Sequence, residues 1–203
     1  MTMLVGIGGG SGSGKTTLVK QLFAACQDLN PIVVEQDHYY FDLSHMDDRE
    51  RGLRNYDIPE AIDLKLISEH LHHLKSGRAV DRPCYDFVTH TRVGTERLEA
   101  KGRLIFFDGI HAFSNQSLYA QFDLGVYVEA ADDVRLSRRV LRDVRDRGRT
   151  MESVVAQYLG SVAPMHRIHV QPTRPLADLV VDWNEPNPRT LKQLVRLIRG
   201  LYQ

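Results

Sequence analysis

A glycine-rich stretch near the start of the chain contains residue types that bind phosphate. Residues 9–16 read Gly-Gly-Ser-Gly-Ser-Gly-Lys-Thr and fit the pattern G-x-x-x-x-G-K-[ST]. Glycines let such a loop curl so that its backbone N–H groups point at phosphate oxygens, and a following helix adds the positive end of its dipole. We therefore expect this loop to bind the phosphate groups of a nucleotide.

Two side chains at the end of this loop have separate expected roles. We expect Lys15 to reach the β- and γ-phosphates of ATP, and we expect the Thr16 hydroxyl to bind Mg²⁺. A glycine-rich turn that only ends or begins a helix is the alternative interpretation, and the flanking strand and helix patterns disfavour it. The expected ATP contacts are Gly9, Gly10, Ser11, Gly12, Ser13, Gly14, Lys15, Thr16 and Thr17.

An apolar run later in the chain ends in a single carboxylate. Residues 104–108 read Leu-Ile-Phe-Phe-Asp, which is typical of a buried strand. In P-loop proteins a second strand presents an acid to the metal ion, so we expect Asp108 to lie beside Mg²⁺. The alternative is an acid that only stabilises the turn at Gly109.

Arginines are concentrated in the third quarter of the chain. Like charges three and four residues apart on one helix repel, so this segment is most easily explained by an anion beside it. Some pairs at i,i+4 spacing are also expected: Arg139 with Asp143, Arg142 with Asp146, and Asp143 with Arg147. We expect residues 143–150 to form a helical lid over the phosphates. The arginines are Arg135, Arg138, Arg139, Arg142, Arg145, Arg147 and Arg149.

The elements that must position these residues alternate between strands and helices. Such alternation predicts an α/β fold with a mostly parallel five-stranded sheet and helices on both faces. At 203 residues the chain is expected to form one domain, residues 1–203. The predicted strands are 3–7, 32–35, 103–108, 124–128 and 179–182. The predicted helices are 15–26, 132–145, 151–162 and 188–202.

Residues 37–98 interrupt this alternation. They contain a charged stretch at 47–54, a predicted helix at 62–74 and a possible β-hairpin at 79–98. An insertion of this size after the second strand is expected to hold the substrate.

Composition excludes several classes of partner and compartment. Lysine plus arginine and aspartate plus glutamate each number 26, so no net charge draws the protein to nucleic acid or to an anionic membrane. Cys26 and Cys84 form neither a C-x-x-C pair nor a disulfide framework. The N-terminus lacks a basic region and a cleavage site. We therefore expect a cytoplasmic protein that binds neither nucleic acid nor membrane.

The motifs that are missing narrow the class of P-loop protein. The chain has neither the N-K-x-D and D-x-x-G motifs of GTPases nor the L-S-G-G-Q-like signature of transport ATPases. Transfer of a phosphoryl group to a bound small molecule is thus the favoured function. A nucleotide-dependent regulatory binding module is the alternative from another class.

Further motifs, taken with these, resemble the uridine kinase (uridine-cytidine kinase) family of P-loop kinases over almost the whole chain. The resemblance implies a nucleotide monophosphate kinase-like fold and phosphorylation of the 5′-hydroxyl of uridine or cytidine by ATP or GTP, giving UMP or CMP in pyrimidine salvage. It also implies a homo-oligomer, a tetramer or a dimer. The motifs that carry it, besides the phosphate loop, are residues 37–40, 55–59, 85–92, 135–143, 147–149 and 157–158.

The resemblance also implies roles for individual residues. Asp37 would face the acceptor hydroxyl as general base or orienting group, and Lys15, Arg142 and Arg147 would complete the catalytic set. Related P-loop kinases acting on a sugar phosphate such as ribulose 5-phosphate, or on another nucleoside, are the alternative. The implied substrate contacts are Asp37, Tyr40, Tyr56, Asp57, Tyr85, Phe87, His90, Arg139, Arg149 and Gln157.

Among these, His90 is expected to read the edge of the pyrimidine. Tyr85 and Phe87 stand at alternate positions before it, so we expect them to point to the same side of one strand. Packing alone is the alternative explanation for this histidine.

Overall fold

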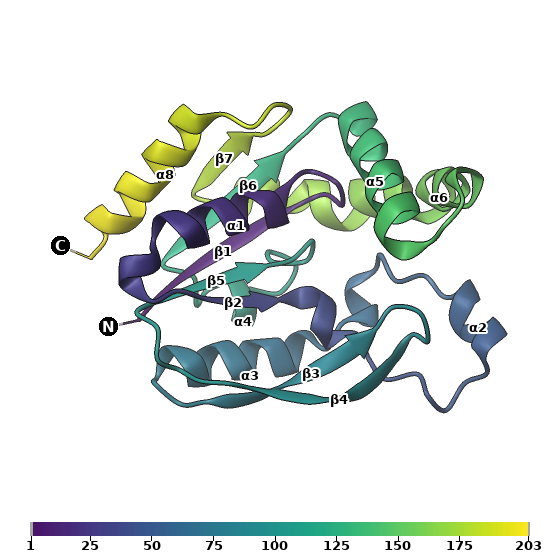
Figure 1. Ribbon diagram of the computed structural model, residues 1–203, viewed down its shortest axis with the longest axis horizontal. Helices are drawn as coiled ribbons and strands as arrows, with labels where there is room; N and C mark the ends of the chain where they lie inside the picture. The colour runs from purple at the N-terminus through teal and green to yellow at the C-terminus, as the bar shows by residue number, and fades with distance from the viewer. Residues whose placement is uncertain (1, 203) are drawn as a thin grey trace.

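A five-stranded parallel sheet forms the centre of the protein in the computed structural model, which describes residues 2–202. The strands lie in the order β2-β5-β1-β6-β7, and all four pairings are parallel (Figure 1). The predicted sheet is confirmed, with strand bounds within two residues of those expected. The strands are β1 (Met3–Gly9), β2 (Ile32–Glu35), β5 (Leu104–Asp108), β6 (Leu124–Glu129) and β7 (Leu179–Asp182).

Helices cover both faces of this sheet, because successive side chains of its buried strands point to opposite sides. In β1, Met3, Val5 and Ile7 pack with α1 (Lys15–Ala25) and α8 (Pro188–Gly200) in one buried cluster. Leu4 points to the other cluster, which includes the apolar side chains of α3 (Leu64–Lys75) and α4 (Gln116–Tyr119). A short 3₁₀ turn, η1 (Gln27–Leu29), connects α1 to β2.

The arginine-rich segment is α5 (Asp132–Arg147), and it is followed by α6 (Met151–Gln157). The chain then continues through π-helical turns at Tyr158–Val162 and His166–Val170, which flank Ala163–Met165, and through a 3₁₀ segment at Gln171–Leu176. The helix predicted at 151–162 is therefore α-helical only as far as Gln157. Pro164, which has no N–H to donate, lies between the two π turns.

The insertion has the predicted helix and hairpin. After η2 (Gln36–Tyr39) and η3 (Pro59–Ala61), α3 packs under an antiparallel pair, β3 (Val80–Asp86) and β4 (Thr91–Leu98). Figure 1 shows this hairpin along the bottom of the molecule, with its turn end below α5 and α6. None of the helices within residues 2–202 is both long and apolar enough to cross a membrane.

One helix of the insertion was not predicted. Residues Asp48–Leu53 form α2 within the charged stretch, and the Asp47 carboxylate accepts a hydrogen bond from the Glu50 N–H at 2.8 Å. Asp47 followed by Glu50 has the spacing of a capping box, a signal that could have indicated this helix. Arg51 anchors it by donating to the carbonyl of Leu43.

Candidate active site

The residues expected to act on a phosphate group meet at the carboxyl ends of three neighbouring strands. In the parallel register Asp108 stands beside Ile7 of β1 on one side and beside Glu35 of β2 on the other. The phosphate loop follows β1, and Asp37 follows β2 directly. Ligands of open parallel sheets bind at this edge, so the fold brings the loop, Asp108 and Asp37 to one site.

The phosphate loop runs from the end of β1 to the first residue of α1. Its last glycine, Gly14, stands at the helix N-cap with a left-handed backbone, φ 98°. The buried Lys15 folds back so that its Nζ donates a hydrogen bond to the Gly10 carbonyl at 2.9 Å. Burial lowers the pKa of Lys15, and the negative charges of Asp108 and Asp37 oppose that decrease.

Thr16 and Asp108 meet as expected of a site for a hard cation. The Thr16 hydroxyl donates to Asp108 Oδ2 at 2.6 Å. Burial raises the pKa of Asp108 to about 6, and Lys15 opposes that increase. Within residues 2–202 no three His, Cys, Asp or Glu side chains are placed so that they could hold a metal ion together. Mg²⁺ is commonly held by one or two carboxylates together with substrate phosphates, so one hydroxyl and one carboxylate fit it.

Gly12 is required for the shape of the loop. Its φ is +79°, and a Cβ placed there would lie 2.3 Å from the backbone oxygen of Arg135.

Gly77 has the same φ of +79° but open space around it. We expect Gly77→Ala to lower the free energy of unfolding by about 1 kcal/mol through backbone strain alone. Gly12→Ala should cost about 3 kcal/mol, because overpacking adds to the strain. Urea unfolding of both variants measures the difference, and equal losses would contradict this account.

Aromatic rings from the insertion gather in a cluster that begins three residues after Asp37, at Tyr40. The Tyr40 ring centroid lies 5.7 Å from that of Tyr56, 5.0 Å from that of Tyr85 and 6.4 Å from that of Phe87. The His90 ring is stacked on Tyr56 at 4.5 Å. The five side chains predicted from the sequence therefore form one cluster.

The prediction that Tyr85 and Phe87 lie on one face of a strand leading to His90 is wrong, although His90 does belong to the aromatic cluster. Strand β3 ends at Asp86, so Phe87 and His90 belong to the hairpin turn rather than to one face of a strand. His90 has a left-handed backbone, φ 55°, and its Nδ1 lies 3.4 Å from the Tyr85 hydroxyl. The turn, and not strand periodicity, brings it to the other rings.

Two carboxylates accompany the aromatic cluster. Asp37 is exposed, and its charge is close enough to raise the pKa of Asp57, Asp108 and Tyr40. Asp57 Oδ2 accepts a hydrogen bond from the Ser161 hydroxyl at 3.1 Å. Burial is the main cause of a raised pKa at Asp57.

The arginines of α5 and the following turn face the same region. Arg139 Nη1 donates to Ser11 of the phosphate loop at 2.8 Å, and its Nη2 donates to Gln157 Oε1 at 2.9 Å. Arg149 also donates to Gln157. The Arg147 guanidinium lies 4.7 Å from the centre of the Phe87 ring, so the lid segment touches the hairpin. A cation over an aromatic face is attracted to it.

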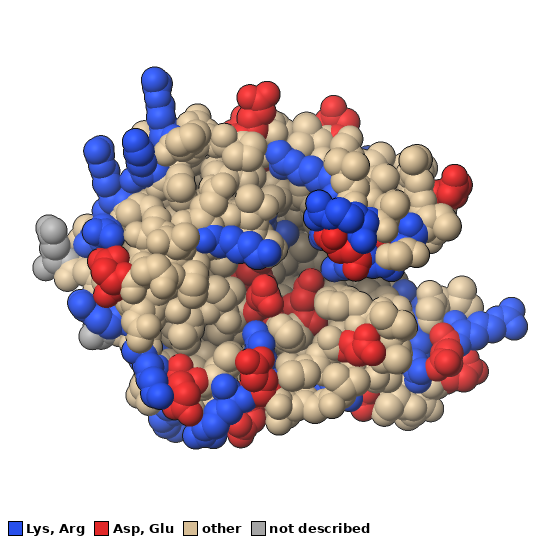
Figure 2. All heavy atoms as spheres, viewed as in Figure 1, with Lys and Arg blue, Asp and Glu red and all other residues tan. Residues whose placement is uncertain are grey.

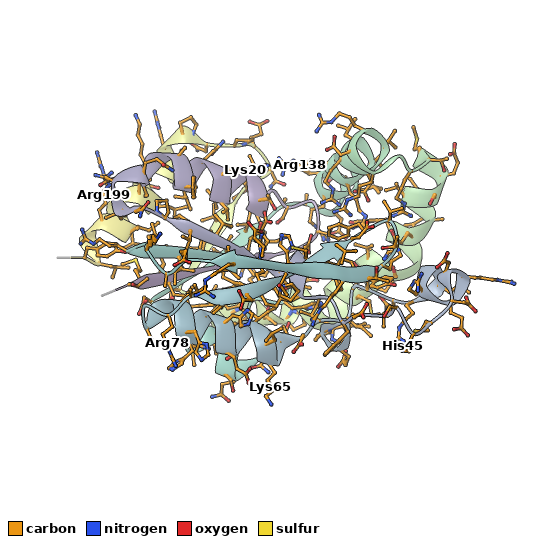
Figure 3. All side chains as sticks on the ribbon, turned by 60° about the horizontal axis from the view of Figure 1, so that its bottom comes forward. Lys20, His45, Lys65, Arg78, Arg138 and Arg199 are labelled. Carbon is orange, nitrogen blue, oxygen red and sulfur yellow. The ribbon has the colours of Figure 1, made fainter. Side chains whose placement is uncertain are left out.

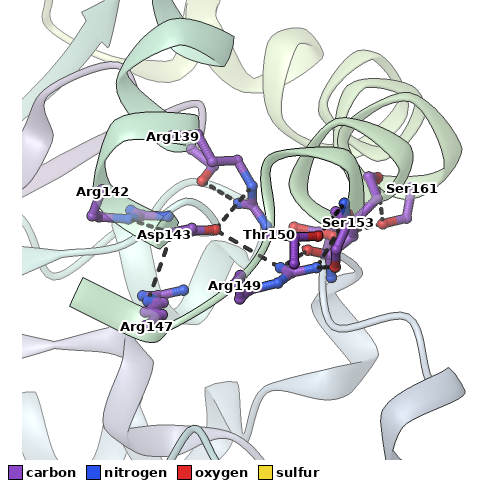
Figure 4. Close-up of polar contacts among 11 residues, drawn as sticks. Arg139, Arg142, Asp143, Arg147, Arg149, Thr150, Ser153 and Ser161 are labelled. Atoms are coloured by element: carbon purple, nitrogen blue, oxygen red, sulfur yellow. Dashed lines mark hydrogen bonds and ion pairs between the residues drawn. The ribbon is translucent and has the colours of Figure 1, made fainter. Parts of the chain in front are cut away.

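The predicted ion pairs are confirmed in part. Asp143 pairs with Arg139 at 3.5 Å and with Arg147 at 3.7 Å. Arg142 was expected to pair with Asp146, but its Nε lies 2.8 Å from Asp143 instead (Figure 4). Asp146 is paired with its neighbour Arg145 at 2.7 Å.

The surface is hollowed where these groups meet. Figure 2 shows a hollow between the lobe formed by α5 and α6 and the lobe formed by the hairpin, with acidic side chains at its floor and basic side chains along its upper rim. A bound molecule in this hollow can thus meet carboxylates on one side and guanidinium groups on the other.

Arg138 has a role that the sequence did not indicate. Its Nη1 donates to the carbonyls of Ser13 at 3.1 Å and of Trp183 at 2.9 Å, and its Nη2 donates to the Asn184 carbonyl at 2.7 Å (Figure 3). It therefore ties the phosphate loop to the segment after β7. Arginine spacing along α5 gives no signal that separates it from its neighbours.

The phosphate loop, the carboxylates and the guanidinium groups lie on a sheet of the order β2-β5-β1-β6-β7. Such a site serves phosphoryl transfer by positioning and by charge. The fold and the site together define a P-loop kinase, a phosphotransferase that acts on a hydroxyl group.

Comparison with known proteins gives the family. The model of the Phosphoribulokinase / Uridine kinase family matches residues 4–187. A uridine kinase of Clostridium novyi (strain NT) is 40% identical over 200 residues, which cover 98% of this chain and 96% of the relative. A uridine kinase of Staphylococcus haemolyticus (strain JCSC1435) is 42% identical over 181 residues, or 89% of this chain and 87% of the relative. The chain belongs to the Phosphoribulokinase / Uridine kinase family.

Among solved structures, a kinase assigned to the fructose transport system of Silicibacter sp. TM1040 has a similar fold. Its TM-score is 0.74 at 26% sequence identity, and the match covers 89% of each chain. The predicted fold class is confirmed.

Proposed function

We propose that this protein transfers the γ-phosphoryl group of ATP to the 5′-hydroxyl of uridine or cytidine. The observation that carries the proposal is the aromatic cluster at residues 40, 56, 85, 87 and 90, which begins three residues after Asp37 and is contacted by Arg147 over the Phe87 ring. Flat aromatic faces suit a nucleobase. Uridine kinases about 40% identical over nearly the full length support the same acceptor.

On the donor side, the loop N–H groups and Lys15 bind the β- and γ-phosphates. Thr16 and Asp108 hold Mg²⁺, which offsets negative charge on the phosphates when it is bound. Arg142, just before the lid, and Arg147, within it, stabilise the charge that develops on the transferred group. GTP is the alternative donor.

On the acceptor side, Asp37 orients the 5′-hydroxyl and accepts its proton. Asp57 and Arg139 contact the ribose hydroxyls, and the rings of Tyr40, Tyr56, Tyr85 and Phe87 enclose the ribose and the base. His90, Gln157 and Arg149 read the pyrimidine edge. Gln157 accepts from both Arg139 and Arg149, which supports a shared position at one end of the acceptor.

We also propose a domain organisation, a metabolic role, a compartment and an oligomeric state for the protein. Residues 1–203 act as one kinase domain, with residues 37–98 as the substrate-binding insertion and residues 143–150 as the lid. The enzyme works in pyrimidine salvage in the cytoplasm as a homo-oligomer, a tetramer or a dimer. The uridine kinases to which the chain is similar support the salvage role.

A coupled assay of ADP formation tests the proposed acceptor. Purified protein with ATP and Mg²⁺ is given uridine, cytidine, nicotinamide riboside, pantothenate or ribulose 5-phosphate in turn. We expect turnover with the two pyrimidine nucleosides. Turnover with only one of the other compounds would show that this compound, and not a pyrimidine nucleoside, is the acceptor. ATP hydrolysis at the same rate with and without every added compound would indicate a regulatory module.

His90 is expected to let the site accept both pyrimidines. Uridine has a carbonyl at C4 and cytidine an amino group, so a tolerant partner must both donate and accept. Burial lowers the pKa of His90, with Arg51 adding to the decrease. The ring is therefore neutral at pH 7 and presents either a protonated or a bare nitrogen. His90→Phe should change the ratio of kcat/KM for the two nucleosides by about 10-fold or more.

Two control variants test whether the change in the kcat/KM ratio is specific to loss of the His90 ring nitrogens. His90→Asn tolerates the left-handed backbone and keeps a donor and an acceptor, so its ratio should stay closer to that of the wild type. His45→Phe, in the exposed loop labelled in Figure 3, should leave the ratio unchanged. If His90→Phe depresses both nucleosides equally, the ring only packs against Tyr56.

A further inference from the structure

Asp143 is a buried carboxylate at the centre of the arginine-rich segment. Its side chain is fully buried, and four guanidinium groups surround it (Figure 4). Arg142 Nε lies 2.8 Å from Oδ1, Arg139 Nε lies 3.5 Å from Oδ2, Arg147 Nε lies 3.7 Å from Oδ1, and Arg149 Nη1 lies 3.8 Å from Oδ2. One negative charge thus faces four positive ones.

These contacts leave most of the arginine donors unused. Only Arg142 donates a hydrogen bond to Asp143; the other three contacts, at 3.5 Å or more, attract by charge alone. Within residues 2–202, the Nη groups of Arg142 and Arg147 donate to no other side chain or carbonyl. Asp143 therefore attracts these two guanidinium groups and leaves their Nη N–H groups available to an anion.

The cluster also joins three parts of the site. Arg139 reaches Ser11 of the phosphate loop, and Arg139 and Arg149 both donate to Gln157 at the end of α6. The Asp143 carbonyl accepts from the Arg149 N–H at 3.2 Å, beyond the left-handed Gly148, φ 62°. Side chain and backbone of Asp143 thus hold Arg149, near the end of the lid segment, against the last turn of α5.

We propose that Asp143 is a positioning residue, which holds Arg142 and Arg147 at the distance and orientation needed to meet the transferred phosphoryl group. The inference rests on the proposed function. Without this charge the four guanidinium groups repel one another, and a small misplacement of groups aimed at the transition state is costly in rate. Substrate binding changes less, because Arg139 keeps its hydrogen bonds to Ser11 and Gln157.

The test compares Asp143→Asn with Asp133→Asn. Asp133 lies in the first turn of the same helix, ten residues before Asp143, and is exposed. We expect Asp143→Asn to lower kcat by about 30-fold with KM for uridine within about threefold. We expect Asp133→Asn to retain wild-type kcat. Equal kcat for the two variants would overturn the proposal.

A double-mutant cycle separates positioning from a purely structural role. If Asp143 acts mainly through Arg142, Asp143→Asn should add less than about threefold to the loss of kcat caused by Arg142→Ala. Multiplicative losses in the double variant would overturn the proposal. If Asp143→Asn does not fold, the cycle uses Asp143→Glu, which keeps the charge but displaces it by one methylene; wild-type kcat in that variant would likewise overturn it.

Assays of the wild-type protein distinguish a failure of this inference from a failure of the proposed function. If it turns over an acceptor other than uridine, the proposed acceptor is wrong, and the same variants are compared with the acceptor that is used. A wild type active on uridine with an equally active Asp143→Asn variant overturns only the positioning role.

Discussion

Replacing Lys15 with alanine is expected to lower kcat by about 1,000-fold or more while the protein stays folded. Lys15 is the cation of the phosphate loop, and in this structure its Nζ is bonded only to the Gly10 carbonyl at 2.9 Å among residues 2–202. That single bond leaves two N–H groups of the ammonium for phosphate oxygens. A buried ammonium offsets phosphate charge far more strongly than a solvated one.

Lys20→Ala is the matched control, because Lys20 lies on the same helix with an exposed side chain (Figure 3). Steady-state turnover and thermal melting of both variants are measured with the acceptor that the wild type uses. Near-normal turnover by Lys15→Ala would refute the assignment of the phosphate loop. A collapse of thermal stability would instead assign Lys15 to the fold.

The sheet and the phosphate loop were predictable because local patterns determine them. Apolar runs of four to six residues mark buried strands, and the run 104–108 pairs with both β1 and β2 as its composition suggests. Glycines before Lys15 and an amphipathic run after it indicate a loop between a strand and a helix. Each of these signals lies within about ten residues of sequence.

The contacts of the lid were less predictable because they depend on tertiary position. Spacing of i,i+4 treats Asp143 and Asp146 as equivalent partners for the α5 arginines. In the fold Asp143 faces the interior, where Arg149 from beyond the helix joins it, and Asp146 faces solvent. Burial, which the sequence of α5 alone does not reveal, decides between them.

The hairpin turn is a second feature that the sequence pattern did not predict correctly. Alternation along a strand predicted a shared face for Tyr85 and Phe87, but β3 stops at Asp86, where the carboxylate accepts from the Val88 N–H at 2.8 Å. An aspartate that bonds the backbone two residues on favours a turn over a continued strand. The aromatic cluster forms nonetheless, because the turn carries Phe87 and His90 back over Tyr40 and Tyr56.

Replacing Asp37 with asparagine is expected to lower kcat by about 1,000-fold with KM for the nucleoside within a few fold. Gln36 fixes the position of the η2 turn, because its Oε1 accepts from the His111 N–H at 2.8 Å across the carboxyl end of β5. Asp37 beside it is exposed. Asparagine keeps the shape but is a poor proton acceptor, so binding should persist while transfer fails. Asp81→Asn, exposed at the start of β3 and paired with Arg97, should retain wild-type kcat.

The pH dependence of this variant identifies which role of Asp37 is lost. The Asp37 charge opposes the decrease that burial imposes on the pKa of Lys15, so Asp37→Asn lowers that pKa further. If the loss of kcat came from a deprotonated Lys15, acidifying the assay would protonate the amine and restore turnover. We expect no such rescue between pH 8 and pH 6, because the missing proton acceptor is not replaced at any pH. Rescue at low pH would assign Asp37 to the charge balance of Lys15, and unchanged kcat with a raised KM would make it a binding residue only.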